Sequence, residues 1–202
     1  MIGMLDQPYV RRVAISLQIL DLSFDHEPLS VFQDFDAFAA INAVVKAPSL
    51  VMDDGTVLLD STLILDTLDR IAPPDRRLAP TDQADFIRAQ RSIGLALAAC
   101  EKTVRIVYEW NVRPAEKRHQ PWLDRVERQL LAAYDALEDA FAGTHGWRFD
   151  ERPFQADITA AVAWRFTRSV LPETVPAARC PALDSLSRRA GALPASLSWP
   201  IA

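Results

Sequence analysis

Lys46-Ala47-Pro48-Ser49-Leu50-Val51 and Asp60-Ser61-Thr62, which starts twelve positions after Pro48, are the most informative stretches of this 202-residue chain. The first is typical of a short strand entered through a proline, and Asp53-Asp54-Gly55 then predicts a hairpin turn. The second is typical of the start of a helix. An extended peptide can pair with a strand whose first backbone groups are unpaired. A helix N-terminus with an acidic residue and a hydroxyl can bind the peptide's two charged ends. The sequence therefore predicts a small peptide site.

Hydrophobic periodicity extends this unit to about 75 residues in the order β-α-β-α-β-β-α. Pro8 suits the first turn of a helix, because its missing N–H would have no partner there. Val10, Val13 and Leu17 then repeat at helical spacing. The predicted elements are a strand at 1–5, a helix at 8–21, a strand at 23–29, a short helix at 33–43, strands at 49–52 and 56–59, and a helix at 61–71.

A proline-rich break follows at 72–80, where three prolines in nine residues end the preceding helix. The strand signal then disappears. Helical patterns cover 82–112, 115–142, 153–169 and 181–191. We expect an α+β domain at 1–74, a linker at 75–80 and an all-α domain at 81–202.

Composition is that of an ordinary globular protein, with 50% hydrophobic and 24% charged residues. The net charge of −5 favours neither nucleic acid nor an anionic membrane as a partner. We find no signal-peptide pattern and no apolar run near the ~20 residues that span a bilayer, so we expect a soluble cytoplasmic protein. The pairs Arg11-Arg12 and Arg188-Arg189 are interpreted as solvated or locally ion-paired.

Neither cysteine nor histidine spacing indicates a metal site. Cys100 and Cys180 form no CxxC motif and are expected to be small buried hydrophobic residues. His119 lacks a set of further ligands at metal-binding spacing. We therefore expect no metal.

Four segments together resemble the soluble, cytosolic glutathione transferase family over nearly the whole chain. The resemblance implies a thioredoxin-like N-terminal domain followed by an all-helical domain. Each motif alone is weak, but their order and spacing are specific. The segments are Asp6-Gln7-Pro8-Tyr9-Val10-Arg11-Arg12-Val13, Lys46-Ala47-Pro48-Ser49-Leu50, Asp60-Ser61-Thr62-Leu63-Ile64 and Gln155-Ala156-Asp157-Ile158.

The family resemblance implies a glutathione site, with glutathione as co-substrate. The Ala47 backbone would pair with the cysteinyl unit, turned toward it by a cis bond at Pro48. Asp60 would bind the γ-glutamyl ammonium, Ser61 the γ-glutamyl carboxylate, and Lys46 the glycyl carboxylate. Each residue has a structural alternative: a proline that begins an edge strand, a helix cap with a nearby charge, and a solvated lysine.

Thiol activation is where this chain departs from the family pattern. Serine-type family members carry a hydroxyl just before the proline of the first helix, and tyrosine-type members carry a phenol a little earlier, on the first strand. This chain resembles the serine type, but Asp6 and Gln7 precede Pro8, so Gln7 stands at the hydroxyl position. The Gln7 amide can donate a hydrogen bond to the sulfur, and the helix N-terminus favours a thiolate. An ionised Asp6 at the sulfur would oppose it, so we expect Asp6 to point away. Gln7 is therefore the candidate catalytic residue.

The end of the first long helix is the candidate second-substrate region. Arg105, Tyr108 and Arg113 are the candidate residues of a pocket for a small hydrophobic electrophile. The alternative is an interface or helix-end role. The aromatic and charged stretch 108–122 is interpreted as a pocket wall or, with slight preference, as a structural corner over packed tryptophans. Asp157 is expected to cap or anchor the last long helix, although Phe154 replaces the family's hydroxyl.

The leading hypothesis is a glutathione transferase that conjugates the glutathione thiolate to an apolar electrophile, a detoxification reaction. The main alternative is a non-catalytic glutathione-binding or regulatory protein of the same fold. Isomerisation or dehalogenation through the same thiolate is a third possibility. A homodimer is implied by the resemblance.

Overall fold

The computed structural model describes residues 1–198. It divides the chain into two compact units, of which one comprises Met1–Ala79 together with the described residues that follow Gly191, and the other comprises Pro80–Gly191. The change from one unit to the other falls within the predicted linker. The described residues after Gly191, which we expected in the helical domain, group with the first unit instead.

The sheet of the first unit is small. β1 (Ser49–Val51) and β2 (Val57–Leu59) pair antiparallel, with Leu50 opposite Leu58. The predicted strands at 1–5 and 23–29 appear only as single bridges, in which Ile2 is parallel to Glu27 and antiparallel to Ser49. Gly3, at φ 134°, turns the chain away after Ile2, and the Leu29 N–H, the next possible ladder donor, instead donates to the Glu27 carbonyl oxygen at 2.9 Å.

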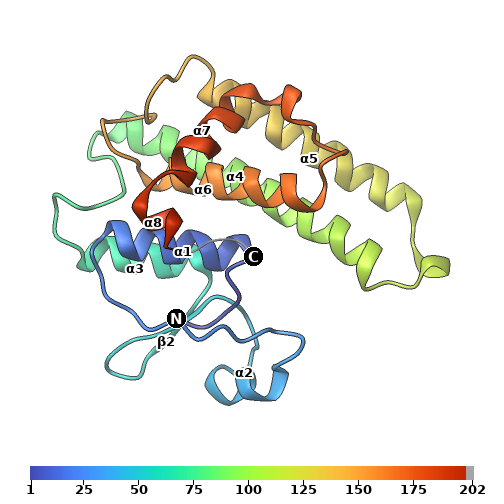
Figure 1. Ribbon diagram of the computed structural model, residues 1–202, viewed down its shortest axis with the longest axis horizontal. Helices are drawn as coiled ribbons and strands as arrows, with labels where there is room; N and C mark the ends of the chain where they lie inside the picture. Colours follow the sequence, from blue (N-terminus) through green and yellow to red (C-terminus); the bar gives the residue numbers. More distant parts are fainter. Residues whose placement is uncertain (199–202) are drawn as a thin grey trace. The chain divides into compact units, whose positions relative to one another are not determined.

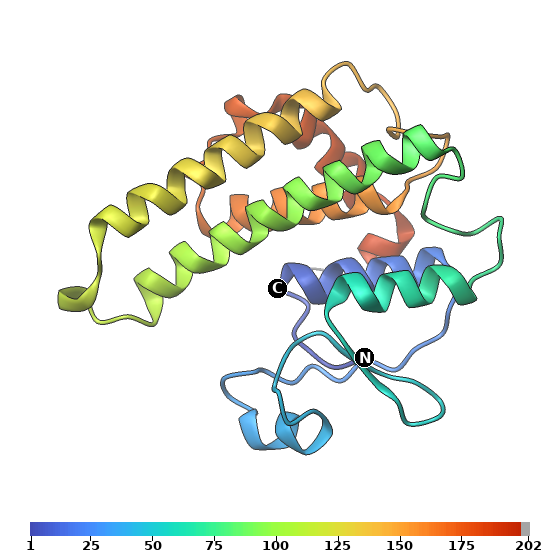
Figure 2. The ribbon, with the colours of Figure 1, turned by 180° about the vertical axis from the view of Figure 1, so that it is seen from behind.

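Helices complete the first unit (Figure 2). α1 (Pro8–Ile19) has Pro8 in its first turn, and α3 (Ser61–Ile71) packs beside it. The short α2 (Phe35–Ile41) lies in the 33–43 region as expected. A four-residue helix that was not predicted, α8 (Pro194–Leu197), packs on α1; it is too short to show a periodic pattern.

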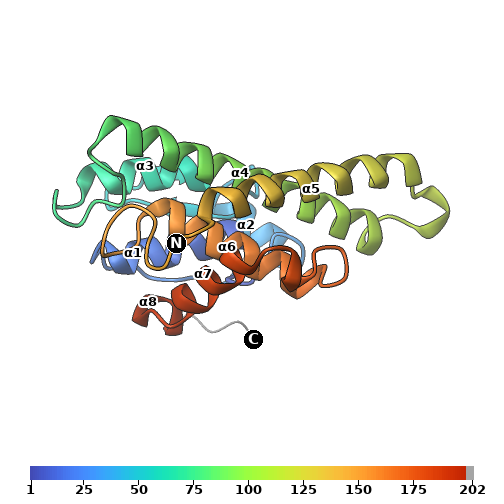
Figure 3. The same cartoon turned by 90° about the horizontal axis from the view of Figure 1, so that it is seen from above.

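The second unit is helical throughout (Figure 1). Its long helices α4 (Gln83–Asn111) and α5 (Gln120–Phe141) run side by side as a hairpin, and α6 (Gln155–Val170) packs against α4 and α7 (Pro181–Gly191) (Figure 3). Two 3₁₀ turns, η1 (Ala115–Lys117) and η2 (Ala177–Arg179), lie in the connections. The predicted thioredoxin-like domain followed by a helical domain is therefore confirmed, with a smaller sheet than expected.

One predicted helix boundary is wrong. The helix expected at 115–142 begins at Gln120, because Arg118 and His119 are extended after η1. Pro121 lies in the first turn of α5, the position that a proline tolerates best.

Within residues 1–198, no helix combines the length and apolar character that crossing a bilayer requires.

Buried polar groups hold the second unit together. Tyr134 meets Trp164 edge-on, with ring centroids 5.3 Å apart, and its hydroxyl donates to the Ala163 carbonyl oxygen at 3.0 Å.

Both cysteines are buried as expected, and burial, reinforced by nearby carboxylates, raises the pKa of Cys180 to about 12. A thiol of that kind is neutral and unreactive near neutral pH.

Asp157 anchors the start of α6, as predicted. It is fully buried, and its two carboxylate oxygens accept the backbone N–H groups of Phe154 and Arg148, each at 3.0 Å. A full capping box also needs a polar side chain at position 154 that accepts the Asp157 backbone N–H. Phe154 cannot accept it, so only the hydrogen bond to the Asp157 carboxylate is present. Burial raises the pKa of Asp157, although both N–H contacts act to lower it.

We predict that Asp157→Ala destabilises the protein by about 2–4 kcal/mol, because one buried and one partly buried N–H group lose their acceptor. Urea unfolding at neutral pH measures this loss. Asp150→Ala is the matched control, because Asp150 also accepts a backbone N–H but lies in an exposed position. We expect the control to change stability by about 0.5 kcal/mol or less. Equal losses in the two variants would contradict the anchoring role.

Candidate functional site

The Ala47–Pro48 peptide bond is cis, as expected. Just beyond it, the Ser49 hydroxyl donates to the Lys46 carbonyl oxygen at 2.8 Å and accepts from the Asn42 side-chain amide at 2.9 Å. No residue within 1–198 forms a hydrogen bond with the Ala47 backbone. The Ala47 N–H and carbonyl therefore remain available for an added strand.

Asn42 shapes the turn that leads to this proline, a role that sequence reasoning missed. Its side-chain oxygen accepts the Val44 N–H at 3.0 Å, and its carbonyl accepts the Val45 N–H at 2.8 Å. Val45 has φ 50°, a left-handed conformation that is unfavourable for a β-branched residue. Such strain persists only where neighbouring contacts fix it, and it concentrates at functional sites. The available signal was the preference of asparagine for turns.

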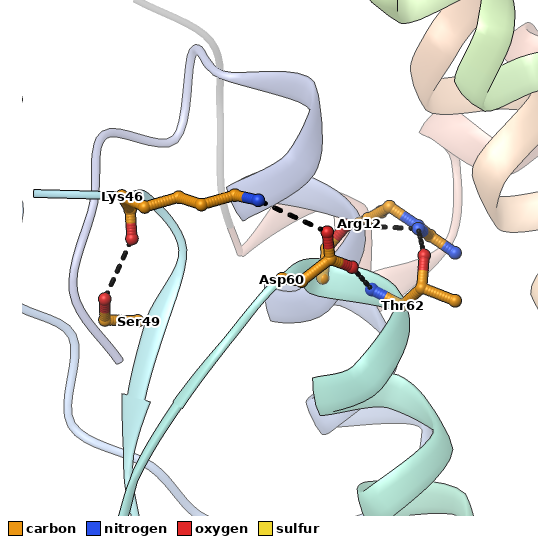
Figure 4. A network of polar contacts seen from close by, with 6 residues as sticks. Arg12, Lys46, Ser49, Asp60 and Thr62 are labelled. Carbon is orange, nitrogen blue, oxygen red and sulfur yellow. Dashed lines mark hydrogen bonds and ion pairs between the residues drawn. The ribbon is translucent and has the colours of Figure 1, made fainter. Parts of the chain in front are cut away.

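Asp60 lies at the start of α3 with φ 71°, which is also left-handed. Its Oδ1 accepts the Thr62 N–H at 2.9 Å, and its Oδ2 lies 3.4 Å from the Lys46 Nζ (Figure 4). Burial acts to raise the pKa of Asp60, but the Thr62 N–H and the Lys46 charge outweigh it, so the pKa is lowered. Asp60 is therefore an ionised carboxylate at the N-terminus of α3.

Ser61 is buried, and it receives a hydrogen bond from Arg12 Nη1 at 3.1 Å. The same guanidinium nitrogen lies 3.4 Å from the Thr62 hydroxyl (Figure 4). Arg11 and Arg12 are both buried, so the interpretation of this pair as solvated is wrong. Two adjacent arginines in α1 gave no indication in the sequence that the Arg12 side chain would reach the first turn of α3. By contrast, Arg188 does form a local ion pair, with Asp184.

Gln7 precedes α1 and is half-buried, and its side chain makes no capping hydrogen bond. Asp6 is exposed. The loop before Gln7 is tightly packed, because a Cβ on Gly3 would lie 2.7 Å from a Val10 methyl and 3.0 Å from the Ala47 Cβ. Gly3 thus brings the loop that carries Gln7 against Ala47. The role of Gln7 in thiol activation stays a prediction.

Arg105, Tyr108 and Arg113 all lie on α4, in the second unit. Arg105 pairs with Glu101 at 2.6 Å, and Arg113 pairs with the buried Glu109 at 2.9 Å. The second pair fits the helix-end alternative for Arg113. Tyr108 is exposed. Their expected role in a second-substrate pocket stays a prediction.

The corner after α4 differs from the expected one. Trp110 and Trp122 are 47% and 39% exposed, so they are not packed beneath the corner. Each instead stacks with an arginine, Trp110 with Arg118 and Trp122 with Arg105. Arginine–indole stacking allows a tryptophan to remain at the surface.

A cavity of about 520 Å³ in the first unit lies beside the end of α1 and α8, and no predicted site residue lines it. Among residues 1–198, no cluster of three or more His, Cys, Asp or Glu side chains could hold a metal ion. The candidate peptide site comprises the Lys46–Ser61 segment and Arg12, which contacts Ser61.

Residues 1–76 match the family described as "Glutathione S-transferase, N-terminal domain". The structure resembles a glutathione S-transferase from Methylobacterium radiotolerans in complex with glutathione sulfonate, at 27% identity and TM-score 0.88 over 98% of this chain and 92% of that one. It also resembles a glutathione transferase family member from Pseudomonas fluorescens with bound glutathione, at 28% identity and TM-score 0.80 over 96% and 95% of the two chains.

A curated relative is a maleylacetoacetate isomerase from Pseudomonas aeruginosa, 27% identical over 160 residues, which cover 73% of this chain and 71% of that protein. Residues 1–76 of the chain thus match a glutathione S-transferase N-terminal domain, and the chain as a whole has the fold of the solved glutathione S-transferases. The resemblance inferred from the sequence motifs is confirmed.

We predict that Asp60→Asn lowers stability at neutral pH by roughly 0.2–1 kcal/mol, because Asn keeps the cap but loses the ion pair. The lowered pKa of Asp60 gives stability that is present above the unfolded-state pKa, about 3.9, and is lost as pH falls through the folded-state pKa. The difference between wild type and variant should therefore disappear at low pH. Urea unfolding over a pH series measures it, with Asp34→Asn, at the start of α2, as control. A difference that persists at pH 2 would contradict the electrostatic origin.

Proposed function

We propose that this protein is a glutathione-dependent transferase whose first unit binds the tripeptide between the Ala47 backbone and the start of α3. The observation that carries the proposal is the combination of a cis Ala47–Pro48 bond with an ionised Asp60 and a buried Ser61 at one helix N-terminus. The glutathione-containing relatives support it.

Each group of glutathione has a partner of matching chemistry in this site. The cysteinyl backbone pairs with the Ala47 N–H and carbonyl as an added strand. Asp60 binds the γ-glutamyl ammonium. Ser61 donates to the γ-glutamyl carboxylate, since Arg12 already occupies one acceptor position of its hydroxyl. Lys46 binds the glycyl carboxylate.

Catalysis consists of positioning the thiol and stabilising its ionised form. The thiol proton is released to solvent, and the thiolate then forms a carbon–sulfur bond with the electrophile. The Gln7 amide donates to the sulfur, and the N-terminus of α1 adds its positive dipole end. Asp6, being exposed, can turn its charge away from the sulfur.

Isomerisation is a second candidate reaction, favoured by the relative named maleylacetoacetate isomerase. The same thiolate would add to a carbon–carbon double bond, allow rotation about the resulting single bond, and then leave, so glutathione would not be consumed. A panel containing an activated aryl halide and a cis-enedione diacid separates the two reactions by whether glutathione disappears.

A non-catalytic binding role is the remaining alternative, favoured by the absence of a hydroxyl or thiol residue just ahead of Pro8.

We predict that the thiol of bound glutathione has a pKa below its free value of about 8.5, and that Gln7→Ala raises it toward that value. Thiolate absorbance followed against pH measures both, and kcat/KM toward an aryl halide should fall about tenfold in the variant.

Gln18→Ala, near the end of the same helix, is the control and should behave as wild type. A bound thiol pKa equal to the free value in wild type would favour the non-catalytic alternative. If the wild type is inactive and Gln7→Ser is active, the non-catalytic alternative is favoured as well.

A further inference from the structure

Lys46 and Asp60 contact each other across the candidate site. The Lys46 Nζ lies 3.4 Å from the Asp60 Oδ2, and the two side chains are 52% and 45% exposed. Figure 4 shows the lysine stem extending from the turn before Pro48 to the start of α3. A primary ammonium group therefore lies where the proposed function places the γ-glutamyl ammonium of glutathione.

Lys46 cannot keep this contact and also bind the far end of the tripeptide. An extended chain spans about 3.3–3.6 Å per residue, so three residues span roughly 10 Å. The glycyl carboxylate then lies well beyond the reach of an ammonium held at Asp60. The lysine has a flexible four-carbon stem, so it can move from one carboxylate to the other.

We propose that Lys46 is an exchangeable partner of Asp60 that makes the site specific for peptides charged at both ends. The amino group of glutathione displaces the Lys46 ammonium from Asp60, and the glycyl carboxylate receives the displaced ammonium. A ligand with the amino group but no glycyl carboxylate must displace Lys46 without offering it a new partner. This inference rests on the proposed function, because it requires glutathione at Asp60.

The pair is weak enough to exchange. A half-exposed lysine–carboxylate pair changes an equilibrium constant by about 1.5- to 5-fold. Asp60 does not depend on the lysine for its orientation, because its other oxygen accepts the Thr62 N–H at 2.9 Å. Removing the Lys46 ammonium therefore leaves the carboxylate in place for the ligand.

Two ligands and two variants test the exchange. The ligands are glutathione and its C-terminal glycinamide, which has the same length but lacks the glycyl charge. Calorimetry at low ionic strength measures their dissociation constants with the wild type, Lys46→Gln and Lys102→Gln. Lys102 is the matched control, because its Nζ also lies 3.4 Å from a carboxylate, that of Glu101 in the second unit, and its replacement changes the net charge equally.

The expected signature is a difference between the two ligands. Lys46→Gln should change glutathione binding by no more than about threefold, because the loss of the glycyl carboxylate's partner and the removal of the competing ammonium act in opposite directions. It should tighten glycinamide binding about 1.5- to 5-fold, because the competing ammonium is gone. Lys102→Gln should leave both constants within about twofold of wild type.

Other outcomes overturn the inference. If Lys46→Gln weakens both ligands equally, or leaves glycinamide binding unchanged, Lys46 does not compete for Asp60, and glutathione binding by the wild type still supports the proposed function. If the wild type binds neither ligand, the proposed function fails and the exchange fails with it.

Discussion

Ser49 holds together the parts of the first unit on which the candidate site depends. Its backbone N–H and carbonyl pair with Ile2 at 3.2 and 2.8 Å, and it lies opposite Leu59 in the hairpin. Its hydroxyl joins the Lys46 carbonyl to the Asn42 amide. The residue is completely buried, so breaking any of these hydrogen bonds leaves a polar group without water. The cis Ala47–Pro48 segment is thus fixed from both sides, while no residue within 1–198 forms a hydrogen bond with the Ala47 backbone.

Local patterns predicted much of this arrangement. The helix at 61–71 was predicted with its observed bounds, because its apolar residues repeat at helical spacing, although the residue that caps it is Asp60 and not Ser61. The cis bond followed from the family resemblance, and the anchoring role of Asp157 from its position near the start of α6. These features depend on a few neighbouring residues, which sequence reasoning can assess.

Features that depend on distant contacts were missed. Whether residues 1–5 and 23–29 become strands depends on pairing across the sheet, and only Ile2 and Glu27 make it. The burial of Arg12 depends on where α3 lies beside α1. The surface stacking of Trp110 depends on a chain reversal that brings Arg118 back to it. In each case a residue's partner lies beyond the range of a local pattern.

The candidate site combines fixed and exchangeable groups. Ser61 is buried and fixed by Arg12, whereas Lys46 and Asp60 are half-exposed and pair weakly. Such a division suits a peptide ligand, because the buried groups set its register while the exposed charges can change partners during binding. Under the proposed function, thiol activation depends on Gln7 and the α1 N-terminus, because no hydroxyl or thiol residue lies just ahead of Pro8.

Backbone amide NMR during a glutathione titration tests most directly whether this segment is the binding site. The account predicts saturable shifts that are largest at the N–H groups of Ala47, Ser61 and Thr62, since these would pair with the peptide or lie at its charged end. Shifts confined to residues around the cavity at Gln18 and Phe24, or no saturable shifts, would contradict it.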